Sequence, residues 1–250
     1  MDRKIDLGFV GIGVVGHALS EAYIKKGFNV YRYDKYKKQY INFIEVLNCD
    51  VIFLCLPTLT INGKQDLSAF IEYLPRLKDY KGLIVIKSTV LPGTTQILSN
   101  MYNLNIIHSP EFLTLEHASH DALNPDRIVV GYDKFQDKGL MYKLFSCFNC
   151  PIVFTNIITS ELIKYACNCE LAMQVSYANE LFDIANTIGA AYEDVKKAML
   201  LDERIGKFKH VTLKRGYGGM CFPKDTEAFI SMFNSKMVKA TIKVNDEVRK

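Results

Sequence analysis

The sequence of 250 residues has no apolar run long enough to cross a bilayer, and its start, Met1 to Asp6, does not form a signal peptide. It has no block of like charge either, since the lysines are spread along the chain and the formal net charge is only +4. Nucleic-acid and membrane binding are therefore not expected. Seven cysteines, an odd count without a secretory signal, favour reduced thiols and a cytoplasmic location.

Internal repeats and low-complexity segments are also missing. The composition, 49% hydrophobic and 23% charged, is ordinary for a globular protein. A chain of this length can bury a sizeable core as one large or two smaller domains.

A glycine-rich turn follows the first predicted strand. That strand covers Ile5 to Val10 and runs into Gly11-Ile12-Gly13-Val14-Val15-Gly16, a helical stretch to Lys26, and a second strand from Phe28 to Tyr33. In such a unit Gly11 makes the turn, Gly13 lets the backbone approach a pyrophosphate at the helix N-terminus, and Gly16 permits close packing of helix on strand. The pattern predicts dinucleotide binding by Gly11, Gly13, Val15 and Gly16.

An acidic residue, Asp34, ends the second predicted strand, 18 residues after Gly16. At this place a carboxylate can accept hydrogen bonds from the adenosine ribose and repels a 2′-phosphate, which favours NAD over NADP. Three nearby lysines, Lys35, Lys37 and Lys38, weaken that preference.

Short apolar segments continue the alternation of strands and helices. The expected strands are Val51–Leu56, Leu83–Lys87, Ile106–His108, Arg127–Gly131 and Ile152–Phe154. Because ligands lie beyond the carboxyl ends of an open parallel sheet, Thr58, Thr89 and Glu111 are candidate site residues. For the two threonines, turn chemistry beside proline is the stronger explanation from the residues alone.

A long helix is predicted from Ser160 to Ile188, with Thr159 or Ser160 as its cap and Glu161 in its first turn. Shorter helices are expected over 193–200 and 238–249. Lys164 and Asn168 lie four residues apart, hence on one face of the long helix, where a lysine and an amide can hold a developing oxyanion. A polar stripe facing solvent is the ordinary alternative. Apolar residues of this helix, such as Leu171, Val175 and Leu181, are expected on more than one face, so part of the helix is expected to pack on a second copy of the chain.

The stretch from Gly216 to Asp225 reads Gly-Tyr-Gly-Gly-Met-Cys-Phe-Pro-Lys-Asp. Pro223 is typical of a helix start, so Cys221 is expected just before a helix N-terminus, with Lys224 beside it. Both features favour the thiolate, which is the nucleophilic form. A helix entry with a buried cysteine is the alternative. Cys147 and Cys150 have redox or zinc spacing but no second pair, so a metal site is not expected.

Together these motifs resemble the nucleotide-sugar dehydrogenases of the UDP-glucose 6-dehydrogenase / GDP-mannose dehydrogenase family. The resemblance covers nearly the whole chain, in family order. It rests on the glycine turn with Asp34, Ser88-Thr89-Val90, Ser109-Pro110-Glu111-Phe112-Leu113, Asn124-Pro125-Asp126-Arg127, Glu161-Leu162-Ile163-Lys164 with Asn168, Asp202-Glu203-Arg204-Ile205-Gly206, and Gly216 to Asp225.

The resemblance implies oxidation of a sugar primary alcohol to a carboxylate in two hydride transfers to NAD. It implies that Lys164, Asn168 and Asp225 serve the first oxidation, that Cys221 forms a thiohemiacetal and then a thioester, and that Glu111 activates the hydrolytic water. Lys224 is implied near the cofactor. The implied substrate contacts are Glu111, Lys164, Asn168, Arg204 and Gly218, and no metal is implied.

Two departures from the family pattern stand out. Leu115 occupies the place of a second family glutamate, with Glu116 one residue later. Family members usually continue into a third domain that covers the nucleotide, whereas this chain ends at Lys250. The residues therefore leave open an active short form, with UDP-glucose favoured over GDP-mannose or an N-acetylated sugar, and a non-catalytic or partner-dependent NAD-binding dimer. A two-domain hydroxyacid dehydrogenase would share the fold but not explain the cysteine motif.

The expected fold is α/β: an N-terminal Rossmann-type doubly wound sheet over residues 1–155, then an all-helical central domain with one long helix over residues 156–250.

Overall fold

The computed structural model describes residues 3–133, 138–205 and 215–250, and of Arg204 only the backbone. The contacts divide the chain into two compact units. The first unit comprises Met1–Leu59 and Gln65–Lys164, and the second comprises Thr60–Lys64 and Tyr165–Lys250. The predicted fold class, a Rossmann-type sheet followed by a helical region with one long helix, is confirmed. The predicted domain division after residue 155 stays a prediction.

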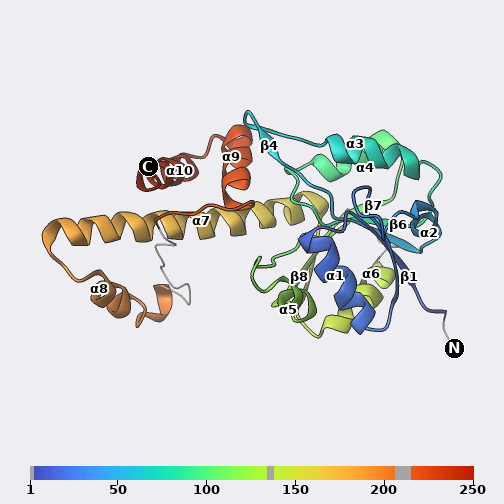
Figure 1. Ribbon diagram of the computed structural model, residues 1–250, viewed down its shortest axis with the longest axis horizontal. Helices are drawn as coiled ribbons and strands as arrows, with labels where there is room; N and C mark the ends of the chain where they lie inside the picture. The colour runs from blue at the N-terminus through green and yellow to red at the C-terminus, as the bar shows by residue number, and fades with distance from the viewer. Residues whose placement is uncertain (1–2, 134–137, 206–214) are drawn as a thin grey trace. The chain divides into compact units, whose positions relative to one another are not determined.

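A twisted sheet forms the centre of the first unit (Figure 1). Within the described residues it has seven strands in the order β2-β1-β3-β6-β7-β8-β9. The chain leaves β1 in one direction to β2 and returns on the other side to β3, so the strand order reverses beside β1. Ligands of such sheets bind at this reversal. The strands are β1 Asp6–Val10, β2 Asn29–Tyr33, β3 Val51–Leu54, β6 Leu83–Ile86, β7 Ile106–His108, β8 Ile128–Gly131 and β9 Ile152–Thr155.

Helices cover both faces of the sheet (Figure 1). One face packs on α1 Val14–Lys25, α5 Ala118–Leu123 and α6 Lys138–Phe145. The other packs on α2 Phe43–Leu47, α3 Ser68–Tyr73, the 3-10 turn η1 Leu74–Leu77 and α4 Thr94–Tyr102. Alternate residues of a strand point to opposite faces, and accordingly Phe53 joins the first core and Leu54 the second. The central strands β3 and β6 are fully buried, which explains their unbroken apolar sequences.

Two features of the sheet and of the segment after β3 differ from the expectation or were missed. The sheet is not wholly parallel, because β8 pairs antiparallel with β7 through His108 and Gly131. A short hairpin of β4 (Thr60–Ile61) and β5 (Lys64–Gln65) follows β3. Asn62 and Gly63 form its turn, both with positive φ, and this asparagine–glycine pair is the sequence signal that could have predicted it.

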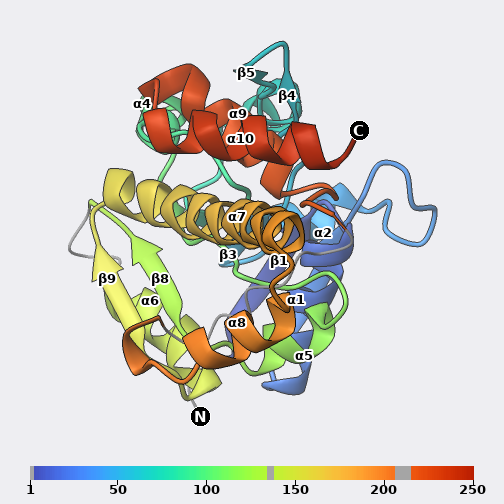
Figure 2. The same cartoon turned by 90° about the vertical axis from the view of Figure 1, so that its left-hand side faces the viewer.

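The second unit is built on α7 (Figure 2). This helix runs from Ile157 to Ile188, 32 residues, or about 48 Å at 1.5 Å per residue. It begins three residues before the predicted start, because the Asn156 side chain accepts a hydrogen bond from the Thr159 N–H at 2.8 Å. In both views α9 (Phe222–Phe233) and α10 (Lys236–Val248) lie on one side of α7 and α8 (Tyr192–Met199) on the other. The short 3-10 turn η4 covers Glu203–Ile205, and η3 of the first unit covers Ser146–Phe148.

Candidate active site

The glycine turn after β1 has the geometry that its sequence predicts. Gly11 has a φ of +87°, and a Cβ there would lie 2.5 Å from the Cys55 carbonyl oxygen. A Cβ at Gly16 would lie 2.0 Å from the Gly11 carbonyl oxygen, so a side chain is excluded at both positions. A Cβ at Gly13 would have no neighbour within 4 Å, which leaves open space in front of the N-terminus of α1. Val15, the fourth predicted cofactor residue, is half-buried and packs against the first core.

Asp34 binds this turn directly. Its Oδ2 accepts the Ile12 N–H at 2.8 Å, and its Oδ1 accepts the Tyr36 N–H at 2.9 Å. A carboxylate offers about four acceptor positions, so two remain for a ribose. Two of the three lysines that could attract a 2′-phosphate have other partners: Lys37 donates to the Ile12 carbonyl and Lys35 pairs with Glu72.

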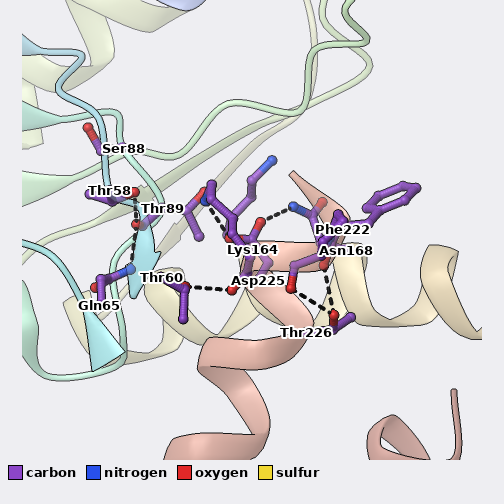
Figure 3. Close-up of polar contacts among 12 residues, drawn as sticks. Thr58, Thr60, Gln65, Ser88, Thr89, Lys164, Asn168, Phe222, Asp225 and Thr226 are labelled. Carbon is purple, nitrogen blue, oxygen red and sulfur yellow. Dashed lines mark hydrogen bonds and ion pairs between the residues drawn. The ribbon is translucent and has the colours of Figure 1, made fainter. Parts of the chain in front are cut away.

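Thr58 and Thr89 are brought together at the carboxyl ends of β3 and β6. The Thr58 hydroxyl donates to the Thr89 carbonyl at 2.8 Å (Figure 3), and both residues are buried. The Gln65 side chain donates to the same carbonyl at 3.1 Å and accepts the Leu91 N–H at 3.0 Å. The threonines thus have a structural role in linking the two strand ends. Sequence reasoning missed Gln65, which carries no motif of its own.

Glu111 and Lys164 meet in the first unit. Glu111 follows β7, and its Oε1 lies 3.3 Å from Nζ of Lys164 on α7. Their side chains are only 12% and 5% exposed, which rules out the solvent-facing stripe as the explanation of Lys164. The other oxygen of Glu111 accepts the Leu113 N–H at 2.6 Å, so the carboxylate is held by its own turn. A buried ion pair of this kind is an acid–base candidate with a defined geometry.

Two further titratable groups lie behind this pair, and sequence reasoning assigned neither of them a role. Burial lowers the pKa of Lys87 to about 8 and the pKa of His108 to about 3, so His108 is neutral at ordinary pH. His108 Nδ1 lies 2.9 Å from the Ser160 hydroxyl oxygen, and Nε2 lies 3.3 Å from the Ser88 carbonyl. For His108, the available signal was a polar residue at the end of an apolar strand.

Glu161 caps the N-terminus of α4, whereas the sequence suggested a role in the first turn of its own helix, α7. It lies in the second turn of α7, not the first, and its carboxylate is fully buried. It accepts the Gly93 N–H at 2.6 Å and the Thr95 N–H at 2.8 Å, which are free donors at the start of α4. Burial raises its pKa, and the two N–H donors act in the opposite direction.

In the second unit, Asn168 and Asp225 form one buried cluster. The Asn168 amide donates to Asp225 Oδ2 at 2.6 Å (Figure 3), and Lys224 pairs with Oδ1 of the same carboxylate. Asp225 is 1% exposed and Asn168 is 6% exposed. The Thr60 hydroxyl donates to the Lys224 carbonyl at 2.7 Å, which attaches the hairpin strand β4 to the first turn of α9. Because one amide N–H of Asn168 is used by Asp225, the second remains for a ligand.

Cys221 is an exposed residue at the N-cap of α9, and Pro223 lies in the first turn of that helix. The predicted helix start is therefore confirmed, and the buried-cysteine alternative is wrong. The approach to Cys221 depends on glycines: Gly216 and Gly219 have φ of +97° and +75°. A Cβ at Gly218 would lie 2.9 Å from a guanidinium nitrogen of Arg249, so a side chain there would displace the end of that arginine. The Arg204 side chain lies outside the described residues.

The remaining cysteines have other surroundings. Cys147 and Cys150 are half-buried free thiols, and burial raises the pKa of each. Over residues 3–133, 138–205 and 215–250 no cluster of three or more histidine, cysteine or acidic side chains is arranged to hold a metal ion. No helix in the same ranges is both long and apolar enough to cross a membrane.

Comparison with known sequences decides the family. Residues 41–149 match the model of the UDP-glucose/GDP-mannose dehydrogenase family, NAD binding domain, and residues 158–247 match the central domain of the same family. The chain belongs to this family. Its first unit is accordingly an NAD-binding domain, as the glycine turn and Asp34 predicted.

Relatives with this architecture are longer than the chain. It is 34% identical to the UDP-glucose 6-dehydrogenase of Rickettsia conorii over 218 residues, which are 81% of this chain and 50% of that protein. The structure of a UDP-glucose dehydrogenase from Pyrobaculum islandicum superimposes with a TM-score of 0.88 at 27% identity, over 98% of this chain and 68% of that one. The chain thus spans about half the length of the Rickettsia relative.

The fold also resembles that of one shorter dehydrogenase. A 3-hydroxyisobutyrate dehydrogenase from Mycobacterium tuberculosis superimposes with a TM-score of 0.77 over 98% of this chain and 94% of that one. Its sequence is only 13% identical, so the likeness concerns the fold alone.

Proposed function

We propose that the chain is an NAD-dependent nucleotide-sugar 6-dehydrogenase, which oxidises the primary alcohol of a sugar to a carboxylate, with UDP-glucose the favoured substrate. The observation that carries the proposal is the exposed Cys221 at the N-terminus of α9, one turn before a buried Asp225 held by Asn168. A structural cysteine needs neither exposure nor a glycine-lined approach. A nucleophile that must reach a bulky substrate needs both.

The NAD site fits the residues that are present. Gly13 leaves open space at the start of α1, where backbone N–H groups and the helix dipole favour a pyrophosphate. Asp34 has acceptor positions left for the ribose hydroxyls. Bound there, NAD would accept one hydride in each of the two oxidations.

The first oxidation converts the alcohol to an aldehyde. Lys164 and Asn168, one turn apart on α7, would hold the alkoxide oxygen through an ammonium and an amide N–H. Asp225 fixes the Asn168 amide in the orientation that offers its free N–H, because the first N–H is bonded to the carboxylate.

The second oxidation would proceed on Cys221. Its thiolate adds to the aldehyde carbon to form a thiohemiacetal, and loss of hydride gives a thioester. Glu111 would then take a proton from water, which attacks the thioester carbonyl and releases the carboxylate product and the thiolate. Covalent capture retains the reactive aldehyde between the two steps.

The purified protein should therefore produce two NADH per nucleotide sugar. NADH formation is measured by near-ultraviolet absorbance, and UDP-glucose, GDP-mannose and N-acetylated sugars are compared as substrates. Cys221→Ser should retain the first hydride transfer but accumulate aldehyde or adduct, because an alkoxide leaves far less readily than a thiolate. Cys150→Ser, at a half-buried thiol of the first unit, is the matched control. The proposal is contradicted if no sugar yields NADH, or if Cys221→Ser turns over like the control.

We further propose that the protein is a homodimer formed through α7. Tyr177, Ile184 and Ile188 recur at helical spacing and are 50%, 52% and 73% exposed, with Leu181 on the same face. Light scattering at micromolar concentration should show a dimer, which Ile184→Asp with Ile188→Asp should dissociate. Ile97→Asp, at an exposed position on α4, should not. A monomeric wild-type protein would contradict this assembly.

The apolar stripe on α7 also favours the second candidate function, an NAD-binding dimer without activity. That function requires no reactive cysteine, so the reactivity of Cys221 separates it from the first. A cytoplasmic location stays a prediction in either case.

A further inference from the structure

Lys87 is a buried lysine at the carboxyl end of β6, only 6% exposed. Its ammonium donates to the Ser109 hydroxyl at 3.2 Å and to the Pro110 carbonyl at 3.1 Å. Both acceptors belong to the turn that follows β7 and carries Glu111. Lys87 therefore binds the two residues immediately before the carboxylate that was assigned to water activation.

The Lys87 contacts determine where Glu111 lies. The Leu113 N–H holds one oxygen of Glu111 within the segment that follows β7. The other oxygen is left facing Lys164. Because the backbone on the N-terminal side of Glu111 is fastened by Lys87, a shift at Pro110 would move the carboxylate away from Lys164.

The charges around Lys87 give this arrangement a pH dependence. Desolvation is the main cause that lowers the pKa of Lys87 to about 8. Lys164 acts in the same direction, and the Glu111 carboxylate acts against it. Cys55 is a neutral thiol, because burial raises its pKa to about 12, and His108 on the adjacent strand is neutral as well. Glu111 is paired with Lys164 and its charge also acts on Lys87, in a buried part of the first unit.

We propose that Lys87 is a positioning residue, which fixes the Ser109–Glu111 turn so that Glu111 faces Lys164, and which holds this turn most firmly while it is protonated. A charged donor makes roughly twice as strong a hydrogen bond as a neutral one, so loss of the proton weakens the hold without abolishing it. The role assigned to Glu111 here rests on the proposed function. The position of Glu111 itself does not.

A direct test follows the Glu111 carboxyl carbon by NMR during a pH titration, with Glu111→Gln used for assignment. In the wild-type protein the signal should shift in a second step at alkaline pH, near the pKa of Lys87. That step should vanish in Lys87→Met and stay in Lys143→Met, at an exposed lysine on α6. Absence of the alkaline step from the wild-type spectrum overturns the inference, whether or not the protein is active and whether or not Lys87→Met folds.

Kinetics provide the second test. Lys87→Met should lower kcat by about tenfold to a hundredfold, the range of one or two charge-assisted hydrogen bonds, and leave KM for the sugar within about threefold. Lys87→Arg stays charged, so it should recover part of the activity and lose the alkaline limb of the pH profile. An active wild-type enzyme whose pH profile is unchanged in Lys87→Met overturns the inference. An inactive wild-type protein with the alkaline NMR step contradicts only the proposed function.

Discussion

The reactivity of Cys221 toward iodoacetamide is the sharpest consequence of the structure, because it can be measured without a substrate. Cys221 is exposed at the N-cap of α9, where the helix dipole favours an anion. Cys49 and Cys55 serve as internal references in the same chain. Desolvation raises the pKa of both thiols to about 12.

The expected difference in rate follows from the fraction of each thiol that is ionised. A thiol with a pKa of about 12, such as Cys49 or Cys55, is ionised in about one molecule in 10⁴ at about pH 8. The thiolate is the reacting form. Cys221, exposed at the positive end of a helix dipole, should therefore react more than about tenfold faster than either reference, before the burial of Cys49 and Cys55 is taken into account.

The measurement is a series of short iodoacetamide pulses, each quenched and followed by peptide mass analysis of all seven cysteines. The denatured protein is the control, in which the seven thiols should react at similar rates. Cys221→Ser should remove the fast phase and leave the others unchanged. If Cys221 in the folded protein reacts within about tenfold of Cys49 or Cys55, the exposed nucleophile is refuted, and the non-catalytic NAD-binding dimer becomes the better account.

Three further predictions concern the first unit. Glu161→Ala should lower the free energy of unfolding, measured by urea denaturation, by about 2–5 kcal/mol, because two buried N–H donors lose their acceptor. Glu161→Gln should lower it less. Equal stability of the wild type and the two variants would contradict the capping of α4. Titration calorimetry should show tighter binding of NAD than of NADP, with the difference narrowed in Asp34→Asn; equal affinities in the wild type would argue against the role of Asp34. Burial lowers the pKa of Lys87 from 10.5 to about 8, so the cost of burying its ammonium is fully present below pH 8 and disappears above pH 10.5. The free energy of unfolding of the wild type, relative to that of Lys87→Met, should therefore rise by about 3 kcal/mol across that pH window. A constant difference would contradict the burial of the ammonium.

Much of the fold could be predicted because its signals are local. Seven sheet strands lie within a few residues of their predicted ranges, since apolar runs bounded by turn residues define each of them within a short window. The positive φ of Gly11 and the start of α9 at Phe222 also depend on neighbours only a few positions away. The start of α7 was misplaced by three residues, because the cap is Asn156 and not Thr159 or Ser160.

The candidate site was predicted in part. Strand ends, helical spacing and the helix-start motif indicated Glu111, Lys164, Asn168 and Cys221, and the family resemblance implied Asp225. The structure shows Glu111 beside Lys164 and Asn168 beside Asp225. The sequence could not reveal Lys87, because the residues around a lysine at a strand end do not show whether its ammonium is buried or exposed.

The sequence by itself determined the glycine turn, the alternation of strands and helices, and the residue types of the candidate site, because each is written in a few consecutive positions. Only the tertiary structure decided which of these groups meet. Glu161 caps α4 from 68 residues away, Asn168 reaches Asp225 across 57, and β8 runs antiparallel to β7. Such pairings depend on how the whole chain packs, since the free energy of a buried charge or donor is set by partners that sequence distance does not reveal.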